Sequence, residues 1–292
     1  MTKQIHTPVE RSPAENAQLA LLLEVAGTPK PGNVDRHRDL SDLRFEQFLA
    51  GAVGSLAGFR LAASGGTIGE ALRTGVQGMS NQSGGNTQFG CLLLLVPLIT
   101  AATRGSLTPD GVKTIVSETT VSDSIDFYRS FEYVDVAVDD PPTDADALDV
   151  RRGAAAAETL RSRALTLYDI MELSANPDGN RPTDGNAEEW TTGFSRSFRA
   201  AEQIATDSGP ILDRAARAFL SLLAEKPDTL VAIKHGRDVA SNVCDRAGAV
   251  GQDLGAAEAL AAEFVEEGIN PGTTADITAA ALFIALERGV EV

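Results

Sequence analysis

The chain has 292 residues and a formal net charge of −16, from 41 Asp and Glu against 25 Lys and Arg. This acidic excess repels nucleic-acid phosphates and anionic membrane surfaces, so we expect neither as a partner. Lysine occurs at only five positions. Molar salt shortens the Debye length to about 3 Å and screens repulsion between carboxylates. The composition therefore predicts a halophilic protein, with an ordinary acidic protein as the alternative.

Helix signals follow one another along the whole chain. Ser12–Glu15 and Thr67–Glu70 have the form of capping boxes, and Thr108-Pro109 and Ser208–Pro210 are typical helix starts. Apolar periodicity predicts further helices over residues 43–63, 90–103, 160–174, 188–206, 229–247, 256–267 and 274–287.

Evidence for strands is poor. Only residues 133–138 alternate in the manner of a strand, and residues 139–149 and 176–187 are typical of surface loops. The sequence therefore predicts an all-α fold, with residues 1–292 forming a single compact multi-helix domain.

Cysteine usage and hydropathy indicate the compartment. Cys91 and Cys244 fit no metal-ligand spacing and no disulfide framework, and both lie in apolar helical contexts. We expect no signal peptide, and the most apolar run, residues 90–102, is too short to span a bilayer. These features predict a cytoplasmic protein.

The first candidate site is the stretch around Lys30, which lies between Pro29 and Pro31. Prolines restrict the backbone, so a lysine held between them loses less entropy when it contacts a phosphate. Asp35 and Asp39 are four residues apart, a spacing that places both carboxylates on one face if the segment is helical. A solvated turn with local salt bridges is the alternative.

The second candidate is the glycine-rich turn at Gly84-Gly85. Its backbone N–H groups can be exposed, and Asn86 and Thr87 can cap the helix that follows. A glycine-rich turn that opens a helix is a candidate anion site. A simple connector is the alternative.

The third candidate lies at Lys234, where Gly236 interrupts an otherwise regular helical pattern. A glycine within a helix costs about 1 kcal/mol relative to alanine. Either the close approach of a ligand or a tight helix–helix contact would explain this residue.

The fourth candidate is the last helix start. Pro271-Gly272 turns the chain, Thr273 can cap the helix that follows, and Asp276 can act as its partner in capping. Alternatively, Asp276 is a carboxylate within reach of a metal at a second Gly/Thr-rich helix N-terminus.

Together these stretches resemble the triphosphoribosyl-dephospho-CoA synthase family. Pro29–Arg36 is similar to the family's Pro-Lys-Pro-Gly-x-Val-Asp/Ser-Arg element, and Gly84–Leu95 is similar to its Gly-x-Asn-Thr-x-x-Gly element. Asn270–Phe283 resembles its closing Pro-Gly-x-x-Ala-Asp helix. Further similar positions are Asp123, Asp184–Phe194 and Asp228–Ala240, so the resemblance spans nearly the whole chain.

The resemblance implies an all-α enzyme that moves the triphosphoribosyl group of ATP to the ribose 2′-hydroxyl of dephospho-CoA and releases adenine. It also implies Mg²⁺ on the triphosphate. The implied catalytic residues are Asp35, Asp39 and Asp276, and the implied metal ligands are Asp35, Asp123 and Asp276. The implied nucleotide-binding residues are Lys30, Arg36, Gly84, Gly85, Asn86, Thr87, Lys234, Gly272 and Thr273.

From this resemblance we expect Lys30, Asp35, Asn86 and Asp276 to meet in one cleft, and a homodimer is compatible with the sequence. The well-studied branch of the family has Asn-Thr-His-Lys-Gly where this chain has Asn86–Gly90, Asn-Thr-Gln-Phe-Gly. Two alternatives therefore stay open. One is a related Mg-nucleotide-dependent transferase or hydrolase with another acceptor, and the other is a non-catalytic helical nucleotide-binding protein.

Overall fold

A computed structural model describes residues 10–139, 146–176 and 182–292. Fifteen α-helices and two short 3-10 helices make up the described part, and no strand occurs there. The predicted all-α fold is therefore confirmed. The alternation at residues 133–138 forms no strand, because this segment is irregular and no strand occurs elsewhere in the described residues with which it could pair.

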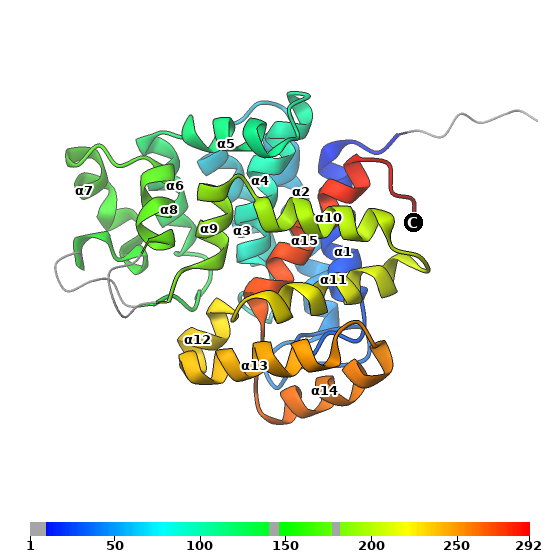
Figure 1. The fold of residues 1–292 in the computed structure, drawn as a ribbon. Helices are drawn as coiled ribbons and strands as arrows, with labels where there is room; N and C mark the ends of the chain where they lie inside the picture. Colours follow the sequence, from blue (N-terminus) through cyan, green and yellow to red (C-terminus); the bar gives the residue numbers. More distant parts are fainter. Residues whose placement is uncertain (1–9, 140–145, 177–181) are drawn as a thin grey trace, which may run out of the picture.

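The centre of the molecule is a bundle of long helices (Figure 1). Its members are α1 (Pro13–Ala26), α2 (Phe45–Ala63), α3 (Ile68–Met79), α4 (Phe89–Thr103), α10 (Ser195–Thr206) and α15 (Gly272–Glu287). Nearly every residue of α4 and α15 is buried, because both sequences are apolar on all sides. These two helices therefore form the core on which the others pack.

Two further groups of helices flank this bundle, and Figure 1 shows α6, α7 and α8 at the left and α12, α13 and α14 at the bottom of the view. The first contains α5 (Pro109–Ser117), α6 (Val121–Ser130), η1 (Asp146–Leu148), η2 (Val150–Ala156), α7 (Ala157–Ser162), α8 (Leu167–Ala175) and α9 (Gly185–Thr192). The second contains α11 (Ile211–Glu225), α12 (Thr229–His235), α13 (Arg237–Val250) and α14 (Leu254–Glu266).

The predicted helix starts are confirmed. Ser12 and Glu15 form a reciprocal capping box at α1, and the hydroxyls of Thr67 and Thr108 accept backbone N–H groups at α3 and α5. Helix α11 begins directly after Pro210. The helix α6 was not predicted.

Three predicted long helices are each two helices, because the backbone turns left-handed between them. The breaks fall at Ala164 with φ of 52°, at Gly193 and Phe194 with φ of 71° and 60°, and at Gly236 with φ of 92°. A Cβ added to Gly236 would meet nothing within 4 Å. A tight helix–helix contact therefore does not explain this glycine, whereas its positive φ does.

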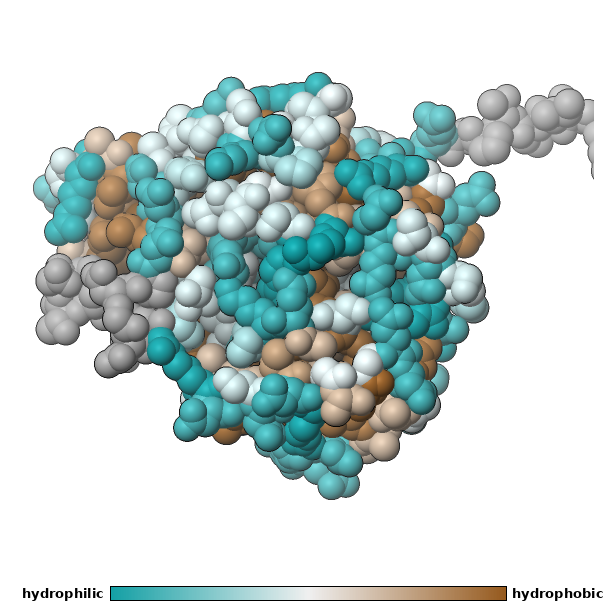
Figure 2. All heavy atoms as spheres, viewed as in Figure 1, coloured by the Kyte–Doolittle hydropathy of each residue, from teal (hydrophilic) through white to brown (hydrophobic). Residues whose placement is uncertain are grey.

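The surface agrees with the acidic composition. Figure 2 shows hydrophilic residues spread over the visible face, with smaller apolar areas between them. No helix in the described part of the chain is long and apolar enough to cross a membrane.

Candidate functional site

A cavity of about 640 Å³ lies where the central bundle meets the two flanking groups of helices. This volume falls within the range that is typical of small-molecule sites. The first residues of α4, α9 and α15 contribute to its wall, as do the last turn of α1 and the irregular segment 135–139. The cavity therefore combines segments that are far apart in the sequence.

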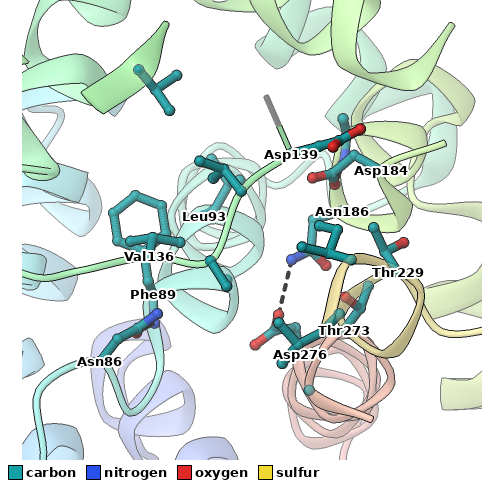
Figure 3. Close-up of a pocket in the computed structure, with 18 of the residues that line it drawn as sticks. Asn86, Phe89, Leu93, Val136, Asp139, Asp184, Asn186, Thr229, Thr273 and Asp276 are labelled. Atoms are coloured by element: carbon teal, nitrogen blue, oxygen red, sulfur yellow. Dashed lines mark hydrogen bonds between the residues drawn. The ribbon is translucent and has the colours of Figure 1, made fainter. Parts of the chain in front are cut away.

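Asp276 is the central polar group of this cavity (Figure 3). The Cys91 thiol donates to Asp276 Oδ1 at 3.1 Å, and Asn186 Nδ2 donates to Asp276 Oδ2 at 2.9 Å. Neither donor is a cation. Burial raises the pKa of Asp276 to about 7, because the two hydrogen bonds offset only part of the cost of desolvating the charge.

The position of Asp276 depends on a glycine in α4. A Cβ on Gly90 would lie 1.9 Å from Asp276 Oδ2 and 2.5 Å from Asn186 Nδ2. No side chain fits there while both hydrogen bonds are kept. The glycine of the Asn-Thr-Gln-Phe-Gly stretch thus makes room for the carboxylate.

The predicted capping role of Asp276 is wrong. Asp276 is the fifth residue of α15 and accepts no backbone N–H group of that helix. Asp228 caps α15 instead, since its Oδ2 accepts both the backbone N–H and the hydroxyl of Thr274 at 2.7 Å. Asp276 therefore does not cap α15, and its carboxylate faces the cavity.

Lys30 lies behind the cavity wall and does not line it. Its side chain is fully buried; Nζ forms an ion pair with Glu24 and donates to Asn33 Oδ1 at 3.1 Å. Glu24 and Asn33 do line the cavity. Burial raises the pKa of Glu24, and the charge of Lys30 opposes that rise.

The segment from Asp35 to Asp39 is a tight turn rather than a helix, so these two aspartates do not share a helical face. Asp35 is fully buried and accepts hydrogen bonds from Thr28 Oγ1 and from the His37 backbone N–H, each at 2.8 Å. Asp39 is exposed and accepts the Phe45 N–H, and Arg36 is also exposed. None of Asp35, Arg36 and Asp39 lines the cavity.

Asp123 lies apart from the cavity and joins two helices. Its carboxylate accepts the Gly69 N–H of α3 and the Thr120 N–H at the start of α6, both at 2.8 Å. These bonds give Asp123 a structural role in this part of the fold.

The remaining predicted residues meet at the cavity, which is lined by Gly84, Gly85, Asn86, Thr87, Lys234, Gly272 and Thr273. Asn86 Oδ1 accepts the Phe89 N–H at 3.0 Å, so Asn86 caps α4 as predicted. The buried Thr87 hydroxyl has no hydrogen-bond partner in the described structure. Of the four residues expected in one cleft, Asn86 and Asp276 line it, whereas Lys30 and Asp35 do not.

Sequence reasoning missed several residues of this cavity. Glu24 is the one acidic residue of the apolar run Leu19–Ala26, which is a signal for a buried carboxylate. Asn186 lies inside a stretch that was noticed only as a resemblance, and Cys91 was interpreted as a small core residue. Their hydrogen-bond partners are distant in the sequence and gave no local signal.

The cavity lining is strongly acidic. Lys234 is its single basic residue among the described residues, against seven carboxylates: Glu24, Asp42, Asp135, Asp139, Asp149, Asp184 and Asp276. Within the same residues, no three His, Cys, Asp or Glu side chains gather closely enough to hold a metal by themselves.

The fold and the cavity define an all-α protein with a cavity of small-molecule size at the N-termini of α4, α9 and α15. The chain belongs to the ATP:dephospho-CoA triphosphoribosyl transferase family, whose model matches residues 10–291. The resemblance noted in the sequence is thereby confirmed. Members of this family are enzymes that transfer a triphosphoribosyl group from ATP to dephospho-CoA.

A solved structure supports the same family. The chain is similar to a candidate triphosphoribosyl-dephospho-CoA synthase from Archaeoglobus fulgidus, with 26% sequence identity and a TM-score of 0.67. The match covers 84% of this chain and 99% of the other. A comparison with curated proteins gives no match.

Proposed function

We propose that this protein transfers the triphosphoribosyl group of ATP to the 2′-hydroxyl of dephospho-CoA, and that Asp276 accepts the proton of that hydroxyl. The observation that carries the proposal is the partly buried Asp276 carboxylate in the cavity of this family's fold. A base whose pKa lies near the working pH is well matched to proton transfer.

The acidic lining also bears on how a triphosphate binds. Carboxylates outnumber cations in this lining, even though Glu24 and Asp149 are paired with Lys30 and Arg151, and this excess disfavours a bare polyphosphate. Magnesium is bound through one or two carboxylates together with substrate phosphates, so this lining fits a Mg²⁺–triphosphate complex. Glu24 is the carboxylate that we assign to the metal, because Lys30 holds it at the cavity wall.

When bound, Mg²⁺ would neutralise phosphate charge and orient the triphosphate. The N-termini of α4 and α15 also open at the cavity, where backbone N–H groups and the helix dipole favour anions. Lys234, Asn86 and Thr273 add side-chain donors at the same wall.

The chemical step exchanges one bond for another at C1′ of the ATP ribose. The 2′-oxygen of the acceptor bonds to C1′ while its proton passes to Asp276, and the C1′–N9 bond breaks with its electron pair going to adenine. Nearby carboxylates stabilise the positive charge that develops on the sugar. Asn186 and Cys91 hold the two oxygens of Asp276 during this step.

The test is the release of adenine from ATP in a high-salt reaction that contains dephospho-CoA and Mg²⁺. Chromatography measures the adenine that is released. We expect Asp276→Asn to abolish release while leaving the Kd for Mg-ATP nearly unchanged. Asp245→Asn is the matched control, because Asp245 is exposed on α13 and does not line the cavity.

Other outcomes would redirect the assignment. If Asp276→Asn weakens ATP binding only when Mg²⁺ is present, Asp276 is a metal ligand rather than the base. If the wild-type protein binds ATP but releases phosphate or nothing, the transferase proposal fails, and a hydrolase or a binding protein takes its place.

A further inference from the structure

The cavity has a second wall of a different character. Opposite Asp184, Asn186 and Asp276, Figure 3 shows apolar side chains of α4 and of the segment 135–138. We call this the apolar wall and define it by six lining residues: Phe89, Leu93, Phe127, Phe131, Val136 and Leu173. The proposed function above gives these residues no role.

Aromatic rings form the centre of the apolar wall. The Phe89 and Phe131 ring centroids are 4.9 Å apart, and those of Phe127 and Phe131 are 5.2 Å apart in an edge-on arrangement. Phe89 and Phe127 are buried, whereas Phe131 and Val136 are only partly covered and Leu173 is 53% exposed. Apolar surface left uncovered at a cavity is typical of a ligand-binding surface.

The backbone beside this wall is also uncovered. Within the described residues, the N–H and C=O groups of Val136, Ala137 and Val138 form no hydrogen bond with another protein group. Backbone donors and acceptors require a partner, which is either water or a ligand. The segment lines the cavity, so its groups are placed to meet a ligand edge.

We propose that the apolar wall binds an adenine ring. The ring offers flat faces to Phe131 and its neighbours, and its polar edge carries an amine donor and a ring-nitrogen acceptor for the backbone at 136–138. Stacking on aromatic side chains is a general way to hold a base. The flexible amide arm of dephospho-CoA has no flat face to stack in this way.

This inference rests on the proposed function for the source of the ring, which we assign to ATP. The bond that breaks joins adenine to the ribose. An adenine on the apolar wall therefore directs the ribose toward Asp276 and the triphosphate toward the N-terminus of α15. Dephospho-CoA carries the same ring chemistry, so the experiment must separate the two sources.

The experiment compares Phe131→Leu with the matched control Phe45→Leu, because Phe45 is also half-buried but does not line the cavity. Calorimetry at high salt with Mg²⁺ measures binding of ATP, dephospho-CoA, free adenine and tripolyphosphate. We expect Phe131→Leu to weaken ATP and adenine by about 5-fold or more, from the loss of stacking. Tripolyphosphate binding and the control variant should not change.

A second variant, Leu173→Asn, keeps the test valid if Phe131→Leu folds poorly, because Leu173 is exposed. We expect the same selective loss from it. We also expect inosine triphosphate to bind wild type more weakly than ATP, because its ring edge reverses the donor and the acceptor.

The results distinguish an adenine subsite for ATP from one for dephospho-CoA and from the absence of such a subsite. Loss of dephospho-CoA binding with ATP unchanged assigns the wall to the acceptor's adenine. If wild type binds neither nucleotide, the proposed function fails, and free adenine alone decides the subsite. If adenine, ATP and dephospho-CoA bind both variants as tightly as wild type, or if adenine does not bind at all, the adenine subsite is wrong.

Discussion

Two charged groups, one behind the cavity wall and one in it, differ in their partners. The Lys30 ammonium is fully enclosed and has an ion-pair partner, Glu24, together with the amide oxygen of Asn33. The Asp276 carboxylate has only neutral donors, Cys91 and Asn186, and it faces the cavity. Both residues come from a proline- and glycine-containing motif.

The difference separates a structural charge from a reactive one. The Lys30 ammonium is compensated by Glu24 and does not line the cavity, so it has little left to offer a ligand. A carboxylate that is desolvated without a cation has a raised pKa and can exchange a proton near neutral pH. The predictions below test this contrast, beginning with the largest expected effect.

Lys30→Ala should reduce the free energy of unfolding by about 3–5 kcal/mol, because it leaves Glu24 buried without its cation. Denaturant unfolding at high salt measures the change. The double variant Lys30→Met/Glu24→Gln is the control and should recover much of the loss, since the uncompensated charge is gone. A stable Lys30→Ala protein that binds ATP more weakly than wild type in the absence of Mg²⁺ would instead show that Lys30 contacts the phosphates.

Asp276→Asn should stabilise the protein at pH 8 and not at pH 4. The pKa of Asp276 in the folded protein is about 7 against the ordinary aspartate value of 3.8, so the folded state binds the proton more tightly. Its contribution to stability therefore falls as pH rises from about 4 to 7 and is constant above. One pKa unit corresponds to 1.36 kcal/mol, so Asp276→Asn removes a cost of burying the ionised carboxylate of up to about 4 kcal/mol.

Unfolding of wild type and Asp276→Asn across this pH range measures the difference, with Asp245→Asn as the control. Equal pH profiles for wild type and Asp276→Asn would show that Asp276 is an ordinary carboxyl, and the contrast with Lys30 would fail.

Gly90→Ala should cost about 1–3 kcal/mol of stability through overpacking. It should also lower kcat by about 100-fold, because the new Cβ displaces the Asp276 carboxylate. Gly248→Ala is the matched control: its Cβ would meet only Ala224 at 4.0 Å, so it should be neutral or stabilise α13 by up to about 1 kcal/mol. A fully active Gly90→Ala enzyme would contradict the assigned role of Asp276.

Salt should have the smallest effect on stability per residue, because its screening is spread over many exposed charges. With a formal net charge of −16, the protein should melt at a higher temperature as KCl rises from low to molar concentration. Thermal melts followed by circular dichroism measure this. A flat or falling melting temperature would contradict the halophilic interpretation.

Local patterns in the sequence were sufficient for most of the fold. Capping residues such as Ser12 and Thr108, and the apolar runs of α4 and α15, predicted where helices lie because these signals act within one or two turns. The left-handed breaks at Ala164 and Phe194 were not predictable, since neither residue favours that conformation and tertiary packing imposes it.

The candidate site, like the fold, was predictable only where it depends on local sequence. The family motifs and the helix start beside Asp276 were predictable from the sequence, because they depend on residues close together in the chain. The exposure of Asp276 to the cavity and the enclosure of Lys30 follow from tertiary packing instead. Cys91 and Asn186 lie 185 and 90 residues from Asp276, and contacts over such separations arise from packing rather than from any local pattern.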